Sequence, residues 1–356
     1  MASLPSPIST RRMIAREAKL SATTVSLVLN NRADAVGIRP ETQERVWAIA
    51  RRLNYTPNPL AVGLSGGRTN TIGLIWSLGG PQAAAETTRD IAGRMQKRGY
   101  LTHLADHGDD LKVTTKLLAD YIRRRVDGIV LQSNSRLLED GTILRQLKEF
   151  PASLMVTGFQ PADDMEIDYL FHDRLPAFVE AATHLARSGR RRPAMLGMWP
   201  STQSKAAAFF GQAARLGMKI QPDAEIDVSL QPKNDSIVAR SHDALAKRFD
   251  GQDFPFDALM CTSDELAVVA MDYLRRRGFR IPEDVAVIGF NDSLLAPYQF
   301  PPLASADRKD SRVAATIEEM IVNRLEHRET PPQRQTIAMQ FVWRESAGAV
   351  STGAKG

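Results

Sequence analysis

The chain has 356 residues, 43% of them hydrophobic, which is enough to bury the cores of two or three domains. It carries a formal net charge of +5 and one cysteine, Cys261, so neither a disulfide framework nor a cysteine-rich metal site is expected, and the six histidines show no metal-ligand spacing. No run approaches roughly 18 apolar residues and the N-terminus lacks the apolar block of a secretory signal, so we expect a cytoplasmic protein with no membrane span, cofactor or metal.

The positive charge is concentrated at the N-terminus. Residues 1–70 contain ten Lys or Arg and four Asp or Glu, a net charge of +6, which leaves −1 for the other 286 residues. A basic head on a nearly neutral body indicates that the head binds a polyanion, most often a nucleic acid. A solvated basic face is the alternative that charge alone leaves open.

Three short helices are predicted in this head. Ser9 and Thr10 can cap a helix over about 11–19, Ser21 can cap a second over about 22–30, and a third over about 40–53 has a proline at its first position. Only a two-residue turn separates the first two helices. Two short helices joined this closely form a helix-turn-helix, whose second helix presents its N-terminal side chains to base edges.

The outward residues of the second helix are small and polar: Ala22, Thr23, Thr24 and Ser26. Such residues suit a helix in a DNA groove, because hydroxyls can bond to phosphates or bases and methyl groups can contact thymine. A purely structural helix pair would more often carry Glu and Lys at these positions.

A short apolar segment joins the head to the rest of the chain. Asn58 can cap a helix that continues through Leu64, with a proline at its first position. This helix is too short to be stable alone in water, and Gly63 weakens it further. We therefore expect it to fold only when another surface supports it.

From Thr71 onward, short apolar runs alternate with amphipathic stretches. The runs are typical of buried parallel strands and are TIGLIW, YLTHLA, DGIVLQ, SLMVTG, PAMLGM, FDALMCT and VAVIGF. Helices are predicted near 82–98, 111–125, 173–188, 203–216, 234–249, 264–277 and 308–327. The alternation predicts an α/β fold with parallel sheets covered on both faces, and the number of strands favours two lobes.

Ligands of such folds bind beyond the carboxyl ends of the strands. The residues at these ends are mainly polar or aromatic: Trp76, Ser77, Gln132, His172, Asp173, Trp199, Ser201, Ser263, Asp264, Asn291 and Asp292. Carboxamides, hydroxyls and carboxylates suit a polyhydroxyl ligand, on which a tryptophan can stack. Ordinary structural roles stay open for each residue: Asp264 is well placed to cap a helix, and His172 to be a hydrogen-bonded interior residue.

The motifs of the head make the sequence recognisable. The stretch IAREAKLSATTVSLVLNN, followed by ETQERVWAIARRLNYTPNPLAVGLSGGRTNTIGLI, resembles the lactose-repressor (LacI) family of bacterial transcription regulators, and the resemblance continues toward the C-terminus. It implies a three-helix helix-turn-helix head and a two-lobe, periplasmic-binding-protein-like body. It also implies a homodimer that binds a pseudopalindromic double-stranded operator under the control of a small effector.

The resemblance implies residue roles in the head and the connecting segment. The DNA-binding residues would be Ser21, Ala22, Thr23, Thr24, Ser26, Leu27, Asn30, Tyr55, Asn58, Ala61 and Leu64. In the family, the leucine equivalent to Leu64 wedges into the minor groove and bends the DNA. Two positions depart from the pattern: Lys19 replaces the usual turn glycine, at a cost of about 1 kcal/mol if it is left-handed, and Leu27 replaces an arginine that bonds guanine.

The resemblance also implies roles in the cleft between the lobes. Asp173 matches a ligand-binding acid, whereas Lys205, Ser263 and Asn291 stand where the family commonly has arginine, asparagine and aspartate. These exchanges change charge and hydrogen-bonding capacity, so we expect a small polar, carbohydrate-like effector and no specific sugar. The full predicted effector set is Trp76, His172, Asp173, Trp199, Lys205, Ser263, Asp264 and Asn291.

The predicted domains follow from these elements. They are a head at 1–57, a hinge helix and linker at 58–70, an effector-binding and dimerisation body at 71–347, and a disordered tail at 348–356. Within the body, lobe 1 is expected at about 71–158 and 293–323, and lobe 2 at about 159–292 and 324–347.

The leading hypothesis is an effector-controlled DNA-binding regulator, a repressor, and not an enzyme. One alternative is an enzyme with Asp173, Asp264 or Asp292 as acid–base groups, but the sequence lacks GxxxxGK[ST], GxSxG and a convincing GxGxxG. The other alternative is a ligand-binding module without DNA binding, but such a module would not need the basic head.

Overall fold

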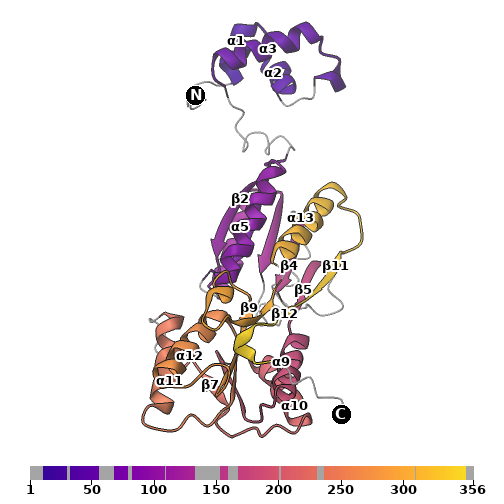
Figure 1. The fold of residues 1–356 in the computed structure, drawn as a ribbon. Coiled ribbons are helices and arrows are strands. Elements are labelled where there is room, and N and C mark those ends of the chain that lie inside the picture. Colours follow the sequence, from indigo (N-terminus) through magenta and orange to yellow (C-terminus); the bar gives the residue numbers. More distant parts are fainter. Residues whose placement is uncertain are drawn as a thin grey trace.

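The computed structural model describes residues 11–29, 33–55, 68–78, 82–108, 110–132, 153–158, 167–199, 202–230, 236–308 and 310–349. They form a small helical head and two α/β lobes (Figure 1). No helix in these ranges combines the length and apolar character that crossing a bilayer would require.

The head consists of α1 (Arg11–Ala18), α2 (Ala22–Leu29), a short 3-10 turn (Asp34–Val36) and α3 (Pro40–Arg52). Apolar side chains from the three helices form its core: Ile14, Ala18, Val25, Val28, Val46 and Ile49. Their helical spacing buries one side of each helix and leaves the basic residues outside. The predicted three-helix head is therefore confirmed.

The first lobe is a six-stranded parallel sheet in the order β11-β5-β4-β3-β1-β2. Its strands are β1 (Thr71–Trp76), β2 (Leu101–Asp106), β3 (Gly128–Gln132), β4 (Ser153–Gly158), β5 (Asp168–Asp173) and β11 (Arg334–Ala338). One face packs on α5 (Gln82–Lys97) and α13 (Asp310–Glu326), and the other on α6 (Leu111–Arg123).

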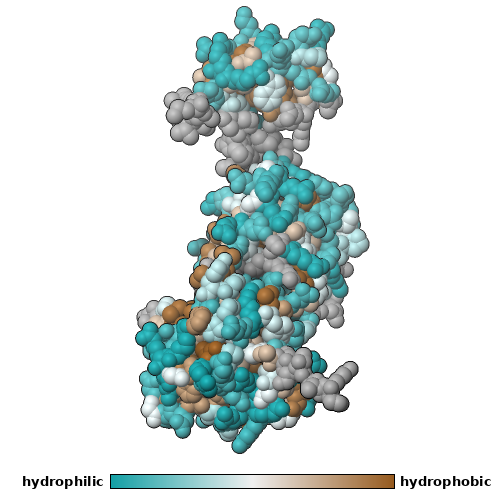
Figure 2. All heavy atoms as spheres, viewed as in Figure 1, coloured by the Kyte–Doolittle hydropathy of each residue, from teal (hydrophilic) through white to brown (hydrophobic). Residues whose placement is uncertain are grey.

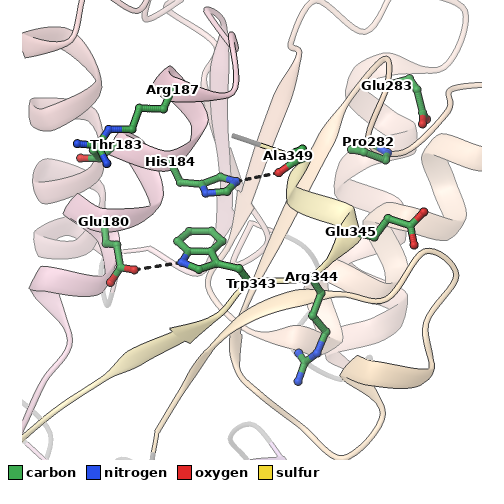
Figure 3. Close-up of a pocket in the computed structure, with 11 residues that line it drawn as sticks. Glu180, Thr183, His184, Arg187, Pro282, Glu283, Trp343, Arg344, Glu345 and Ala349 are labelled. Atoms are coloured by element: carbon green, nitrogen blue, oxygen red, sulfur yellow. Dashed lines mark hydrogen bonds between the residues drawn. The ribbon is translucent and has the colours of Figure 1, made fainter. Parts of the chain in front are cut away.

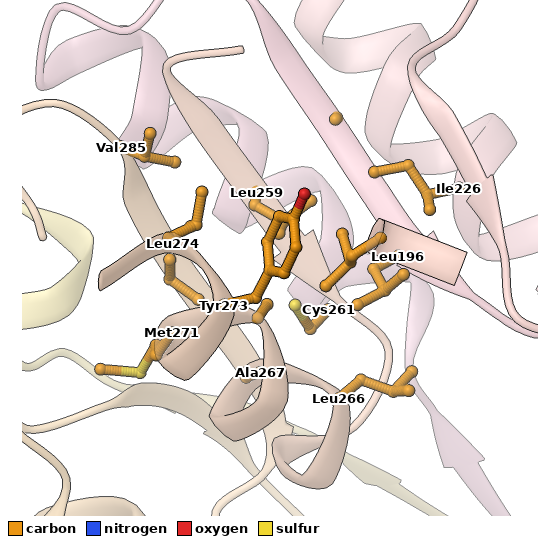
Figure 4. Packing of buried hydrophobic residues seen from close by; sticks show 14 of the residues in the cluster. Leu196, Ile226, Leu259, Cys261, Leu266, Ala267, Met271, Tyr273, Leu274 and Val285 are labelled. Atoms are coloured by element: carbon orange, nitrogen blue, oxygen red, sulfur yellow. The ribbon is translucent and has the colours of Figure 1, made fainter. Parts of the chain in front are cut away.

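The second lobe has the strand order β12-β10-β9-β8-β6-β7, with only β12 antiparallel to its neighbour. Its strands are β6 (Pro193–Gly197), β7 (Glu225–Asp227), β8 (Ala258–Cys261), β9 (Ala286–Asn291), β10 (Ala304–Asp307) and β12 (Gln340–Val342). One face packs on α9 (Leu175–Arg187) and α10 (Gln203–Arg215), and the other on α11 (Ile237–Phe249) and α12 (Asp264–Arg276). Figure 4 shows part of the latter core, where Cys261 is buried among leucines and Tyr273.

The chain crosses between the lobes after β5, after β10, and between β11 and β12. The first and third crossings touch, because the Met339 amide donates to the Asp173 carbonyl at 3.3 Å. The predicted lobe boundaries need correction on this account. β5 and β11 pair in the first lobe and β10 pairs in the second, whereas the prediction placed each of these segments in the opposite lobe. The strand with which a segment pairs decides which lobe it belongs to, and apolar runs in the sequence do not reveal that pairing.

Candidate functional site

The N-terminus of α2 is the exposed part of the helix-turn-helix. Ser21, Ala22 and Thr23 are exposed, and Thr24 is partly buried. The Ser21 hydroxyl accepts a hydrogen bond from the Thr24 amide at 3.0 Å and lies 2.8 Å from its hydroxyl, as predicted for a capping serine. The cap leaves the first turn of α2 open toward solvent, so the remaining small side chains are free to approach a groove.

Two predicted DNA-contact residues have internal partners in the head. Arg11 donates from Nη1 to the Ser26 hydroxyl at 3.2 Å and from Nε to the Tyr55 hydroxyl at 3.1 Å. These bonds tie α1 to α2 and to the segment that follows α3. Ser26 and Tyr55 thus help to orient the helices, and a direct role in DNA contact stays a prediction for them, as it does for the partly buried Leu27.

The turn between α1 and α2 has the left-handed backbone conformation that was anticipated at Lys19. Lys19 has φ 52°, in the left-handed region that favours glycine. Its amide bonds to the Arg16 carbonyl, and the next amide bonds to Ala15. The predicted contacts Asn30, Asn58, Ala61 and Leu64 lie outside the described residues.

Two predicted effector residues lie at the carboxyl ends of first-lobe strands. Trp76 ends β1 and His172 lies near the end of β5, and their side chains are 2% and 6% exposed. Neither Trp76 Nε1 nor His172 Nε2 has a hydrogen-bond partner among the described residues. Burial first, and then the charges of Arg174 and Arg308, hold the pKa of His172 well below its ordinary value, so its ring is neutral.

A second group of predicted residues lies on the second lobe around the start of α10. The Lys205 ammonium lies 5.7 Å from the ring centroid of Phe290, at the end of β9, and 6.0 Å from that of Phe178, on α9. The two rings stack on each other with 4.7 Å between centroids. Trp199 is partly buried against the same core, and its amide donates to Asp227 at 3.2 Å.

The structure adds two arginines that sequence reasoning missed. Arg174 directly follows β5 and Arg308 directly follows β10, each preceded by an aspartate at the strand end. Burial and then Arg308 lower the pKa of Arg174 to about 10. Burial, then Arg174 and then Arg308, lower the pKa of Lys205 to about 7. Both arginines thus add positive charge to the surroundings of Lys205.

The predicted residues on α12 support the second lobe from within. Ser263 caps α12 by accepting from the Leu266 amide at 3.4 Å. Asp264 is 1% exposed and accepts from the Ser305 hydroxyl at 2.6 Å and from the Ser293 amide at 2.5 Å. Burial raises the pKa of Asp264 to about 6. These bonds engage both carboxylate oxygens, so Asp264 positions the loop that follows β9, and effector contact by either residue stays a prediction.

The loop after β9 is held in an unusual backbone conformation. Asn291 and Asp292 have φ values of 104° and 49°. Asp292 accepts from Arg344 Nη1 at 2.6 Å, and its amide donates to the Ser305 hydroxyl at 2.9 Å. Asn291, the partly buried last residue of β9, takes part in none of these bonds and directly precedes the anchored turn.

A separate pocket of about 750 Å³ lies on the second lobe and contains none of the predicted effector residues (Figure 3). Its wall is an aromatic stack in which His184 lies 3.9 Å and Phe341 lies 4.3 Å from the ring centroid of Trp343. Trp343 Nε1 donates to Glu180 at 3.2 Å, and His184 Nε2 lies 3.1 Å from the Gly348 carbonyl. The rings thus stack on one another, and the ring nitrogens Trp343 Nε1 and His184 Nε2 have partners within the chain.

Two family models match this chain, one over the head and the other over much of the body. Residues 12–58 match the family described as bacterial regulatory proteins, lacI family, and residues 182–347 match a periplasmic binding protein-like domain. The chain is 26% identical over 347 residues to the HTH-type transcriptional repressor PurR of Aliivibrio fischeri strain MJ11, covering 94% of this chain and 96% of that one. It is 22% identical over 349 residues to PurR of Haemophilus influenzae strain PittEE, covering 96% and 100%.

Solved structures show the same fold over almost the whole chain. The lac repressor dimer bound to operator and the anti-inducer ONPF has a TM-score of 0.78 at 19% identity, covering 97% of this chain and 100% of that one. The transcriptional regulator CelR–cellobiose complex has a TM-score of 0.63 at 25% identity, covering 95% and 99%. The predicted fold, with its helical head and two lobes of largely parallel sheet, is thereby confirmed.

Proposed function

This chain belongs to the lacI family of bacterial regulatory proteins, and we propose that it is a cytoplasmic, homodimeric repressor whose operator affinity is set by a small polar effector bound between its lobes. The proposal is carried by one observation: the same chain contains an exposed helix-turn-helix and a two-lobe body whose strands end in polar residues. Neither part alone would couple DNA binding to a ligand.

The proposed DNA interface is the first turn of α2. Two heads related by a two-fold axis would place two such helices in successive major grooves, which calls for a pseudopalindromic operator. Most of the affinity would come from phosphate contacts made by the basic head, so binding should weaken steeply with salt. The small side chains Ala22 and Thr23 would allow the helix to approach the bases closely.

The head joins the body at a point that is fixed to the first lobe. Asp127 accepts hydrogen bonds from the amides of Thr69 and Asn70 at 2.8 and 2.7 Å, just before β1. A movement of the first lobe would therefore be passed to the segment that carries the head. Effector binding would bias lobe closure, which in turn would set the spacing of the two heads in the dimer.

The effector is proposed to be a sugar or sugar derivative. Trp76, His172, Asp173, Lys205 and Asn291 present aromatic, imidazole, carboxylate, ammonium and carboxamide groups around the strand ends of both lobes. This mixture suits a small molecule with several hydroxyl groups. A screen of sugars, sugar acids and purines by thermal shift of the full-length chain identifies the class, because a ligand that binds the folded state raises the melting temperature.

The DNA-binding proposal is tested by adding one negative charge to the exposed turn of α2. Thr23→Glu should lower affinity for the operator, selected from random duplexes by the wild-type chain, by about 10-fold or more, because the carboxylate would face phosphates. An acidic residue in the first turn favours the helix itself, so the head should still fold. Gel-shift titration measures the effect.

The matched control is Ala239→Glu, which adds the same charge near the start of α11 in the second lobe. It should leave operator affinity unchanged. If Thr23→Glu binds as tightly as this control, or if wild-type chain enriches no sequence, the assignment of DNA binding to α2 is wrong.

A further inference from the structure

One side of α2 is left open by the packing of the head. The buried side carries three residues of the core: Val25, Val28 and Leu29. An α-helix turns by about 100° per residue, so the residues on the side away from this core lie next to one another around the helix: Ala22, Ser26, Thr23 and Leu27. Ala22 and Thr23 are exposed, and the other two are partly buried. We call these residues the open face of α2.

Two hydroxyl groups on and beside the open face already have partners within the head. Arg11 Nη1 donates to the Ser26 hydroxyl at 3.2 Å, which directs this oxygen toward α1. The Thr24 hydroxyl, beside the open face, lies 2.8 Å from the Ser21 hydroxyl. The groups left to face outward are therefore mainly methyl groups: those of Ala22, Thr23 and Leu27.

The composition of α2 restricts which bases it can distinguish. Selective polar contacts in the major groove use Arg or Lys for guanine, Asn or Gln for adenine, and Asp or Glu for cytosine. The sequence of α2, ATTVSLVL, contains none of these residue types. The Thr23 hydroxyl can bond to several bases and so selects weakly among them. The base feature that remains for the open face is the C5 methyl group of thymine, which lies in the major groove.

We propose that α2 recognises its half-site through thymine methyl groups, which pack against Ala22, Thr23 and Leu27. This inference rests on the proposed function, because it names the feature of the operator that the same helix reads. Short side chains in the first turn let the helix come close to the bases, and apolar groups are in contact within about 4.5 Å. The operator should therefore have A·T pairs where the open face meets it, with the thymine methyl groups turned toward the helix.

Methyl contacts of this kind are large enough for the selectivity that a repressor needs. Burial of one methyl group strengthens binding about threefold to fivefold. Contacts by three residues in each half-site would multiply to about 30- to 100-fold, and two half-sites in a dimer to roughly 10³–10⁴-fold. Ratios of specific to non-specific DNA binding begin at about 10³, so this chain would lie at the low end of that range.

The test removes the methyl groups from the DNA one at a time. The full-length chain first selects its operator from random duplexes, and each thymine of the selected half-site is then replaced by uracil. This exchange deletes the C5 methyl group and leaves base pairing and the minor groove unchanged. Gel-shift titration should show a loss of affinity of about threefold to fivefold at the thymines that the open face contacts.

Thr23→Ser deletes the matching methyl group from the protein and keeps the hydroxyl. It should bind the thymine operator about threefold to fivefold less tightly than wild-type chain, and this remaining affinity shows that the head is folded. At one thymine of the half-site, uracil should then cause no further loss, because the contact is already gone. The control is Thr42→Ser on α3, which removes a methyl group elsewhere in the head and should leave every uracil effect as in wild-type chain.

The proposal is overturned if no uracil replacement in the half-site lowers the affinity of wild-type chain, or if every such loss persists undiminished in Thr23→Ser. A selected half-site without thymine has the same consequence. In these cases a selected operator still exists, so the proposed function stands and only the methyl readout is removed. If wild-type chain enriches no sequence from the random duplexes, the proposed function fails and this inference fails with it.

Discussion

At the scale of single residues, Lys205 links ligand charge to pH. Its surroundings are the rings of Phe178 and Phe290 and the positive charges of Arg174 and Arg308. Desolvation and the two arginines lower its pKa to about 7. A sugar acid whose carboxylate bound beside the ammonium would favour the protonated form and raise the pKa again, so its binding would take up a proton above neutral pH.

If the thermal-shift screen identifies a sugar acid such as gluconate, whose charge is constant near neutrality, its affinity should fall as pH rises through about 7. The decrease should approach about 10-fold per pH unit until the pKa of the complex is reached. Lys205→Arg, which keeps its charge throughout, should give a flat profile. Calorimetry at pH 6 to 9, in buffers with different ionisation enthalpies, measures both affinity and proton uptake, and an affinity that rises with pH in wild-type chain contradicts the assignment.

The sequence locates some residues of the cleft and misses others for a definite reason. Trp76, Ser263 and Asn291 lie at the ends of apolar strands or directly after them, and the apolar runs reveal these ends. Arg308 follows β10, whose sequence ASAD has no large apolar residue, so no strand end is predicted there. The role of Asp264 needs the three-dimensional position of Ser305, which is 41 residues away in the chain.

At the scale of elements, α13 is locked to the sheet of the first lobe by a buried ion pair. Arg324 donates from Nε and Nη2 to the two carboxylate oxygens of Asp168 at 2.8 and 2.7 Å. The Asp168 side chain is 1% exposed and also accepts from the Gln333 amide at 2.7 Å. This pair joins the last long helix to β5 and to the approach of β11, so it holds together segments that are more than 150 residues apart.

Arg324→Ala should lower the free energy of unfolding by about 3–5 kcal/mol, because it leaves the buried Asp168 carboxylate without its charged partner. The control is Arg276→Ala, which breaks an exposed pair with Asp272 of similar length, 2.7 Å, and should cost about 0–1 kcal/mol. Urea unfolding followed by circular dichroism provides the comparison. Equal losses in the two variants would mean that the pair contributes no more than a surface contact.

Helices are predicted better than strands at this scale. The seven body helices in the described residues lie where amphipathic spacing places them, because each must cover a sheet face with one apolar side. The strands β7, β10 and β12 have only three or four residues, too few for an apolar pattern to stand out. The predicted lobe boundaries are wrong partly for this reason, because β10 belongs to the second lobe and is too short to be recognised in the sequence.

At the scale of the whole molecule, we propose that exposed apolar residues of both lobes form the contact with a second copy of the chain. Leu101 and Leu104 are 64% and 48% exposed on β2, which is the edge strand of the first sheet. Tyr298 and Phe300 are 82% and 81% exposed in the second lobe. Figure 2 shows apolar side chains gathered along one edge of the body where the lobes join. Exposed apolar surface of this kind favours association, and the proposed repressor requires a dimer.

Dimerisation and operator binding should be lost together. Leu104→Lys and Phe300→Asp each place a charge in the proposed contact and should shift the chain toward monomer in light scattering. Leu230→Asp, at a position outside that contact that is 79% exposed, should not. A monomer carries one head, so its affinity for a two-fold operator should fall roughly 100-fold or more toward that of a half-site, with the head itself unaltered. A variant that becomes monomeric but keeps full operator affinity would contradict the idea that the spacing of two heads transmits the effector signal.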